Sequence, residues 1–184
     1  MKTAKTSRDG RFLGGVAKVL VVAALAGCFG ISAAQDGPTA QSLRAAMVFN
    51  FLKFTEFPPA SQTDPRLRLC FSVGDPAQAD ALTALAGRRV WNREVVVTRL
   101  GEGGDACQVI YVDSRQRWDA AAGSRAAGGA LTISDYRGFM DEGGMIEIDM
   151  DADGNRFGIN LAQARLAHLR LSPQLLRLAR RIHE

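Results

Sequence analysis

The sequence predicts an α/β fold: a layered single domain with a mixed β-sheet flanked by helices, which ends in a C-terminal hairpin followed by two helices. Segments with the two-residue period of strands alternate along the chain with segments that carry helix start and stop signals, which is typical of such domains. Near the C-terminus, alternating runs at 146–151 and 156–161 flank a turn cluster at Asp153-Gly154-Asn155, and they predict antiparallel edge strands. An apolar fraction of 47% in 184 residues is enough to fill one core.

The first 34 residues are expected to be a secretory signal peptide, which leaves 35–184 as the folded domain. Basic residues precede an apolar run from Val19 to about Cys28, and Ser32-Ala33-Ala34 offers a small-x-small cleavage site. The run is shorter than the ~20 residues that span a bilayer. Lipidation stays open as an alternative to cleavage after Ala34, because Leu25-Ala26-Gly27-Cys28 resembles a lipobox in which Cys28 would be acylated.

Export changes what the charge and the cysteines indicate. Of 23 basic and 19 acidic residues, the first 34 residues hold five and one, which leaves 18 of each. The excess positive charge therefore belongs to the export signal, and no nucleic-acid partner is expected. Two cysteines, Cys70 and Cys107, remain in an oxidising compartment, where a disulfide between them is favoured over two separately buried thiols.

The first expected helix, from Gln41 to the Pro58-Pro59 pair, is unusually apolar. Its apolar residues fall on two sides of the helix. They are Leu43, Met47, Phe51 and Phe54 on one side, and Val48, Phe49 and Leu52 on the other. A helix of this kind is either a buried core helix or one shared with a partner or a second subunit, and both interpretations stay open.

The remaining elements follow from turn and cap residues. Further strands are expected at 66–73, 94–100, 108–112 and 131–133, and further helices at 76–86, 115–127, 162–169 and 173–182. Asp75-Pro76 and Ser172-Pro173 each supply an N-cap followed by a first-turn proline. The last helix is expected to present four apolar side chains inward, namely Leu175, Leu176, Ala179 and Ile182.

Three acids, Asp75, Asp113 and Asp135, each follow an expected strand. In an open α/β sheet the carboxyl ends of the strands are where ligands bind, so these acids raise the hypothesis of metal-dependent phosphoester hydrolysis. Each acid also stands where a helix N-cap is wanted, which is the structural alternative. A small-ligand receptor would use the same acids together with Trp91 and Trp118.

Two other patterns suggest metal binding only weakly. Asp149, Asp151 and Asp153-Gly154 have the spacing of the first half of a calcium loop, but the twelfth position is Asn160 and the flanking runs are typical of strands. The two histidines, His168 and His183, have no metal-like spacing. The sequence contains no motif that pairs a nucleophile with its base, and neither catalytic residues nor a cofactor are expected.

Five segments carry a more specific pattern. They are RAAMVFNFLKFTEFP from Arg44, LCFSVGDP from Leu69, CQVIYV from Cys107, LTISDYRGFMDEGGMIEI from Leu131 and FGINLAQARLAHLRLSPQLLRLAR from Phe157. In this order and spacing they resemble the YfiR family of bacterial periplasmic regulators, over nearly the whole chain after the signal. Phe57 stands where that family commonly has tryptophan, which leaves the packing there plausible.

The resemblance implies a non-enzymatic repressor. Such a protein acts from the periplasm on an inner-membrane diguanylate cyclase, binds its periplasmic sensory part, and lowers cyclic di-GMP, exopolysaccharide and biofilm formation. The family also implies a homodimer, an outer-membrane lipoprotein as antagonist, and a structural disulfide at Cys70 and Cys107. A second cysteine pair that some members carry is missing from this sequence, so redox sensing through that pair does not carry over.

Overall fold

The structure is a computed structural model, and it describes residues 37–59, 64–102, 106–123, 129–151 and 154–184. The expected signal peptide, its cleavage site at Ala34 and the lipobox cysteine Cys28 lie outside the described residues. The same holds for Asp153 of the expected calcium loop and for residues 124–127 of the expected third helix.

The described chain builds a mixed eight-stranded sheet, as the sequence predicts. Its strands are β2 (Arg66–Ser72), β3 (Arg89–Val90), β4 (Arg93–Arg99), β5 (Val109–Val112), β6 (Leu131–Ser134), β7 (Ile146–Asp151), β8 (Gly154–Asn160) and β10 (Arg181–His183). They lie in the order β10-β8-β7-β6-β5-β2-β4-β3. Among the described pairs of this sheet, only β3–β4 and β7–β8 are antiparallel. A separate small sheet pairs β1 (Thr55–Glu56) antiparallel with β9 (Arg170–Leu171).

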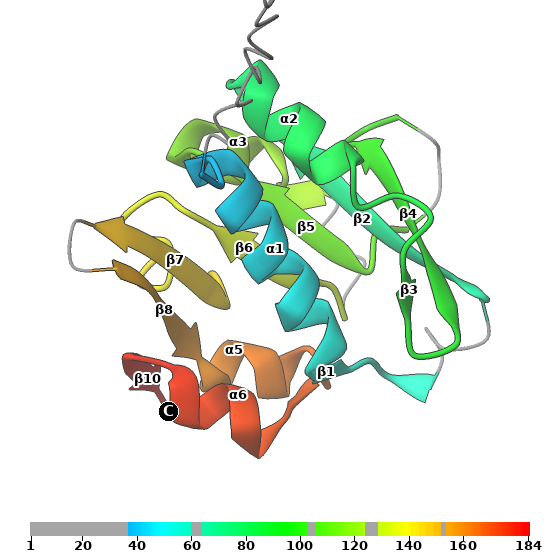
Figure 1. Cartoon of the computed structure of the whole chain (residues 1–184). Helices are drawn as coiled ribbons and strands as arrows, with labels where there is room; N and C mark the ends of the chain where they lie inside the picture. Colours follow the sequence, from blue (N-terminus) through cyan, green and yellow to red (C-terminus); the bar gives the residue numbers. More distant parts are fainter. Residues whose placement is uncertain (1–36, 60–63, 103–105, 124–128, 152–153) are drawn as a thin grey trace, which may run out of the picture. The chain divides into compact units, whose positions relative to one another are not determined.

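Helices cover both faces of the sheet (Figure 1). They are α1 (Ala40–Lys53), α2 (Pro76–Thr83), α3 (Arg115–Ala120), α5 (Leu161–Leu166) and α6 (Pro173–Leu178). Alternate residues of β5 enter two different clusters, because successive side chains of a strand point to opposite faces. Val109 and Tyr111 pack in the cluster that includes α1, whereas Ile110 and Val112 pack against Trp118 of α3.

Helix α1 is a core helix within the described chain, and it crosses one face of the sheet (Figure 1). Thr39 caps it by accepting a hydrogen bond from the Ser42 backbone N–H at 3.1 Å. Both apolar sides pack against the core, with Met47 and Phe54 only partly buried. Phe51 meets Phe157 of β8 edge to face, and Phe49 is covered by the Arg88 guanidinium at 3.7 Å. The helix ends at Lys53 rather than near the prolines, because Thr55 and Glu56 pair with β9.

The C-terminal end differs most from the prediction. Helix α6 begins at Pro173 after the Ser172 cap, as predicted, but it ends at Leu178 because Ala179 has an extended backbone. The chain then forms β10, which pairs in parallel with β8 and occupies the sheet edge that the hairpin was expected to occupy. The prediction that Ile182 points inward from a helix is therefore wrong, since this side chain is 40% exposed on β10.

Smaller differences lie at element ends. The two-residue strand β3 was not predicted, because Arg89–Val90 is too short to show a period. Leu161 starts α5 rather than ending β8, since Asn160 caps that helix by accepting from the Gln163 backbone N–H. Leu166, the last residue of α5, is 73% exposed although it is apolar.

The turn between β6 and β7 is packed around Phe139, which is fully buried. Its ring meets Trp118 at 4.7 Å and Tyr136 at 5.3 Å between centroids, both edge to face. Gly144 lies directly against this ring, so that a Cβ added there would be 2.3 Å from ring carbons of Phe139. Only glycine leaves room for the ring at this position.

Replacing Gly144 with alanine is expected to lower the free energy of unfolding by about 1–3 kcal/mol, the usual cost of overpacking. The Phe139 ring cannot retreat, because Trp118 and Tyr136 hold it from two sides. Urea unfolding of the chain lacking residues 1–34 measures the change. The control is Gly123→Ala, since an added Cβ at Gly123 meets no atom within 4 Å, and its midpoint should stay the same or rise slightly. An unchanged midpoint for Gly144→Ala would contradict this packing.

Candidate functional site

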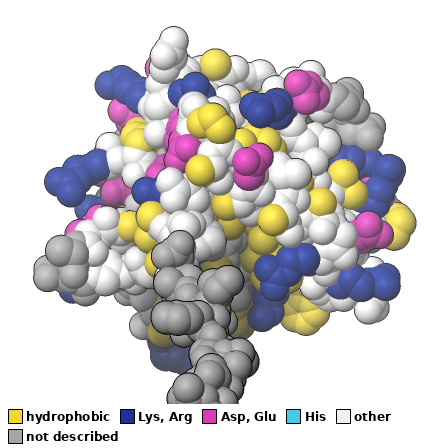
Figure 2. Space-filling model, turned by 45° about the horizontal axis from the view of Figure 1, so that its top comes forward, with side chains coloured by type: hydrophobic (Ala, Val, Ile, Leu, Met, Phe, Trp, Pro, Cys, Tyr) yellow, Lys and Arg dark blue, Asp and Glu magenta, His cyan; other side chains and the backbone are white. Residues whose placement is uncertain are grey.

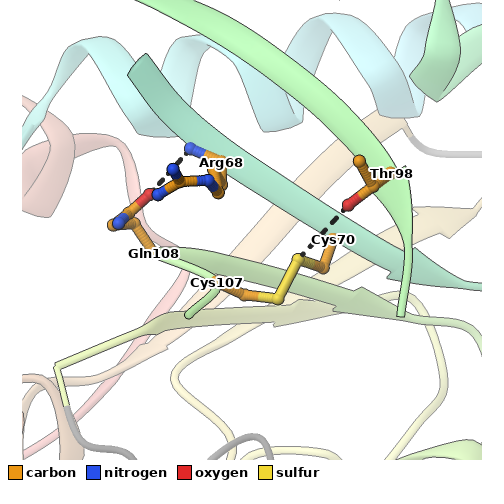
Figure 3. Close-up of a disulfide and its surroundings, with 5 residues drawn as sticks. All are labelled: Arg68, Cys70, Thr98, Cys107 and Gln108. Carbon is orange, nitrogen blue, oxygen red and sulfur yellow. Dashed lines mark hydrogen bonds between the residues drawn. A yellow bond between two sulfur atoms is a disulfide. The ribbon is translucent and has the colours of Figure 1, made fainter. Parts of the chain in front are cut away.

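A disulfide joins the centre of the sheet. Cys70 lies on β2 and is buried, and Cys107 lies just before β5, with 5.8 Å between the two Cα atoms (Figure 3). The bridge forms there because β2 and β5 are parallel neighbours, with Cys70 opposite Ile110. The Thr98 hydroxyl of β4 faces the Cys70 sulfur at 3.7 Å, so the bridge lies among three adjacent strands.

A polar clamp beside the bridge sets the register of β5. The Gln108 side-chain oxygen accepts from the Arg68 backbone N–H at 2.7 Å, and the Gln108 backbone N–H donates to the Arg68 carbonyl at 3.1 Å (Figure 3). The Gln108 side-chain oxygen thus takes the place of a backbone carbonyl and extends the hydrogen bonding between β2 and β5 by one residue. The covalent link and the clamp hold the same two strands together.

The three strand-end acids gather at one edge of the sheet, as their positions predict. Strands β2, β5 and β6 are parallel neighbours, so the loops that follow them leave the sheet on the same side. Asp113 accepts from the Gly74 backbone N–H at 2.6 Å and lies 3.3 Å from the Arg117 guanidinium. Asp75 caps α2 and also accepts from the Gln41 side chain of α1 at 2.9 Å.

Asp135 is held by an arginine from α1. The Arg44 Nε lies 2.8 Å from a carboxylate oxygen of Asp135, and an Arg44 Nη donates to the Gln78 side chain of α2 at 3.3 Å. Burial raises the pKa of Asp135 above its ordinary value of 3.8, and Arg44 offsets part of the rise. The hydrogen bond from Gln41 instead lowers the pKa of Asp75. The sequence did not indicate Arg44 as a partner, because the two residues are 91 positions apart.

The contacts of Asp75, Asp113 and Asp135 can be compared with what metal-dependent hydrolysis would need. Each of the three acids is engaged by backbone N–H groups or by a side chain of α1 or α3. In the described ranges, no group of three or more His, Cys, Asp or Glu residues is arranged to hold a metal ion. The geometry thus serves to attach α1, α2 and α3 to the sheet edge. A polar cavity of about 210 Å³ lies beside Asp135, lined by Arg44, Arg137 and residues of β7.

The calcium-like acids lie on a strand. Asp149 and Asp151 belong to the regular antiparallel pairing of β7 with β8, and each lies 3.9 Å from the Arg180 guanidinium. A strand cannot wrap around an ion as a calcium loop does, so the described part of this pattern does not form one. Asp149 and Asp151 are instead partly exposed side chains of the hairpin that pair with Arg180.

The two tryptophans are far from equivalent. Trp118 is buried in the small cluster under α3, and its indole N–H donates to the Glu142 carbonyl at 3.2 Å. Trp91 lies in the loop between β3 and β4 with 70% of its side chain exposed. The two rings therefore do not form a ligand-stacking pair, and of the two only Trp91 is exposed to solvent.

One buried carboxylate was missed by the sequence analysis. Glu147 is only 5% exposed, although its alternation with Ile146 and Ile148 predicts a solvent-facing side chain. It accepts from the Gly138 and Met140 backbone N–H groups at 3.1 and 3.3 Å, and from the Arg181 guanidinium at 3.0 Å. It thereby attaches β10 to the β6–β7 turn, a role that strand periodicity cannot reveal.

The surface charge is mixed. On the face drawn in Figure 2, lysine and arginine side chains are interspersed with aspartate and glutamate rather than gathered into one field. This agrees with the neutral balance that the sequence predicts after the export signal is removed. Within the described part of the chain, no helix is both long enough and apolar enough to cross a bilayer.

The fold and the site together define a disulfide-linked α/β domain whose buried polar groups hold its own elements in place. The chain belongs to the YfiR/HmsC-like family, whose model matches residues 41–180. This is a regulatory family of periplasmic proteins that act on diguanylate cyclases, and the membership confirms the resemblance carried by the five segments.

The chain was also compared with functionally curated proteins and with solved structures. No functionally curated protein matches the chain. Among solved structures, the crystal structure of a conserved domain protein from Vibrio cholerae O1 biovar El Tor str. N16961 is similar, with 11% sequence identity and a TM-score of 0.47. The match covers 78% of this chain and 60% of that one, so this chain spans about three fifths of that protein's length.

Removing the disulfide by the double change Cys70→Ala and Cys107→Ala is expected to lower the free energy of unfolding by about 4 kcal/mol. The bridge closes a loop over a sequence separation of 37 residues, and its loss returns the entropy of that loop to the unfolded chain. Urea unfolding of the oxidised protein and of the double variant measures the difference. Reductant should destabilise the wild type but leave the double variant unchanged. Equal midpoints for the two oxidised proteins would contradict the prediction.

Asp135→Asn is expected to change how stability depends on pH. Because the folded pKa of Asp135 is raised, the native protein binds a proton there before the unfolded chain does, so wild-type stability gains relative to the variant as pH falls toward 3.8. Urea unfolding of both proteins between about pH 7 and pH 4 measures this difference.

The lowered pKa of Asp75 acts in the opposite direction on stability, but its effect is common to both proteins. The exposed Asp80→Asn variant is the control and should parallel the wild type; a constant gap for Asp135→Asn would refute the prediction.

Proposed function

We propose that this protein is a periplasmic repressor of an inner-membrane diguanylate cyclase, which it holds inactive by binding the cyclase's periplasmic part. Repression would lower cyclic di-GMP and biofilm formation. The observation that carries the proposal is the family match over residues 41–180, which spans the whole sheet except the last strand. The protein itself makes no product in this proposal.

The physical requirement for repression is a difference in affinity. A binding protein shifts a partner between two states only by binding one state more tightly than the other. Moving a cyclase from almost fully active to almost fully inactive takes a difference of about 5.5 kcal/mol. A preformed surface helps the protein to bind the inactive state tightly, because little conformational entropy is lost on binding. The disulfide and the Arg68–Gln108 clamp support a preformed body of this kind.

The compartment and the assembly belong to the same proposal. Residues 1–34 would direct export and be removed after Ala34, leaving residues 35–184 as the periplasmic domain; lipidation at Cys28 is the alternative route to the same compartment. By family, the protein would form a homodimer and be released from the cyclase by an outer-membrane lipoprotein.

Deleting the gene is expected to raise cyclic di-GMP and biofilm formation, because the cyclase would lose its repressor. Quantifying cyclic di-GMP in cell extracts is the measurement. Expression of the full chain should restore the low level, whereas the chain without residues 1–34 should not, because it would stay on the wrong side of the membrane. Cys28→Ser should restore the low level if cleavage follows Ala34. A deletion strain with unchanged cyclic di-GMP in every growth condition would refute the proposal.

A further inference from the structure

The hairpin between β3 and β4 presents a strained and exposed tryptophan. Val90 pairs with Arg93, so the connecting loop consists of Trp91 and Asn92 alone. Trp91 has a backbone φ of 55°, a conformation that favours glycine and is costly for a bulky residue. Its ring is 70% exposed and repays little of this cost by burial. Strain of this kind at an exposed aromatic residue points to a function outside the fold.

Positive charge surrounds this loop. The segment from Arg88 to Glu94 carries three arginines and one carboxylate. Arg88 shares the Phe49 ring with Lys53 of α1, at 3.7 and 5.9 Å from its centroid. Arg89 is exposed on the edge strand. No carboxylate among the described residues forms an ion pair with Lys53, Arg88 or Arg89, in contrast to the arginines near the strand-end acids. These cations are available to an acidic partner.

A cavity of about 460 Å³ lies beside the tryptophan. It is lined by Thr55, Glu56, Phe57, Trp91, Asn92 and Arg93. The hairpin and β1 thus form its two walls, and both lie on the same side of the fold in Figure 1. Phe57 is buried beneath the Arg93 guanidinium, at 5.9 Å from its ring centroid, and gives the cavity an apolar wall. A hollow next to an exposed ring suits an inserted side chain better than it suits a flat layer of lipid headgroups.

We propose that the Trp91 surface, defined as Lys53, Arg88, Arg89, Trp91 and the adjoining cavity, is the docking site of a partner protein with an acidic segment. Carboxylates of the partner would face Arg88 and Arg89, and an apolar side chain would enter the cavity beside Trp91. Tryptophan and arginine are the residues that most often carry the binding energy of protein interfaces. Opposite charges across such a surface steer the encounter and select the partner. The identity of this partner as the cyclase's periplasmic part rests on the proposed function.

The first test uses Trp91→Gly in the full chain, expressed in the deletion strain. Glycine accepts a positive φ, so the variant should fold as well as the wild type, with an equal or higher melting temperature. It should nevertheless lose repression and leave cyclic di-GMP at the level of the deletion strain. The pair Arg88→Glu and Arg89→Glu should do the same. Leu166→Ser, which changes an exposed apolar side chain on α5, is the matched control and should repress normally.

If wild-type protein represses and these variants repress equally well, the docking site is wrong while the proposed function stands. A second measurement decides the case in which the wild type has no effect on cyclic di-GMP. A photo-reactive benzoylphenylalanine at position 91 of the full chain is activated in living cells, and the adduct is identified by mass spectrometry. A protein adduct that is lost when Arg88 and Arg89 are reversed to glutamate supports the docking site independently of the cyclase. No adduct, a lipid adduct, or a protein adduct that survives the charge reversal overturns it.

Discussion

The structure depends on one constraint, the position of β2 between β4 and β5. Parallel strands on both sides satisfy its backbone, and its alternate residues Leu67, Leu69 and Phe71 are buried in the cluster that includes α1. A strand enclosed in this way cannot shift register without exposing its apolar face. The disulfide from Cys70 adds a covalent link to β5, which is the neighbour of β2 that lies farther away in the sequence. The order of the remaining strands follows from this centre, because β4 extends the sheet on one side and β5 on the other.

The same constraint explains why a site-like group of acids can serve the architecture. Parallel strands require crossover connections, so the loops after β2, β5 and β6 converge at one edge whatever their chemistry. Here the converging acids attach helices: Asp75 and Asp113 bind backbone N–H groups, and Asp135 binds Arg44 of α1. A partly buried ion pair contributes little net stability, because desolvation offsets much of the attraction, but this one links α1 to the loop after β6. Position at a strand end is therefore a weak indication of catalysis unless the acids are left free.

The centre of the sheet and its β3 edge have different physical properties. The centre is covalently linked and fully buried at β5 and β6, where most of the side chains are apolar. The edge at β3 is short, positively charged and strained at Trp91. A protein that acts by binding needs both properties, since a rigid centre keeps the edge preorganised and the edge carries the groups that a partner meets. The β10 edge is instead held by the contact of Arg181 with Glu147, whereas Arg89 on the β3 edge forms no ion pair with a carboxylate in the described part of the chain.

Local signals in the sequence were sufficient to determine the α/β class, the mixed sheet, the β7–β8 hairpin and the caps at Asp75 and Ser172, because each depends on residues close together in the chain. The family was determined in the same way, by short segments such as Gly138-Phe139 with Gly143-Gly144, which the structure explains through the ring packed on Gly144. Tertiary structure alone decided that Ile182 lies on a strand, that Glu147 is buried, and that Arg44 meets Asp135. These depend on pairings between distant segments, such as β10 with β8, whose hydrogen bonds and burial outweigh local helix preference. Periodicity reports which side of an element faces inward, and only packing determines what covers the other side.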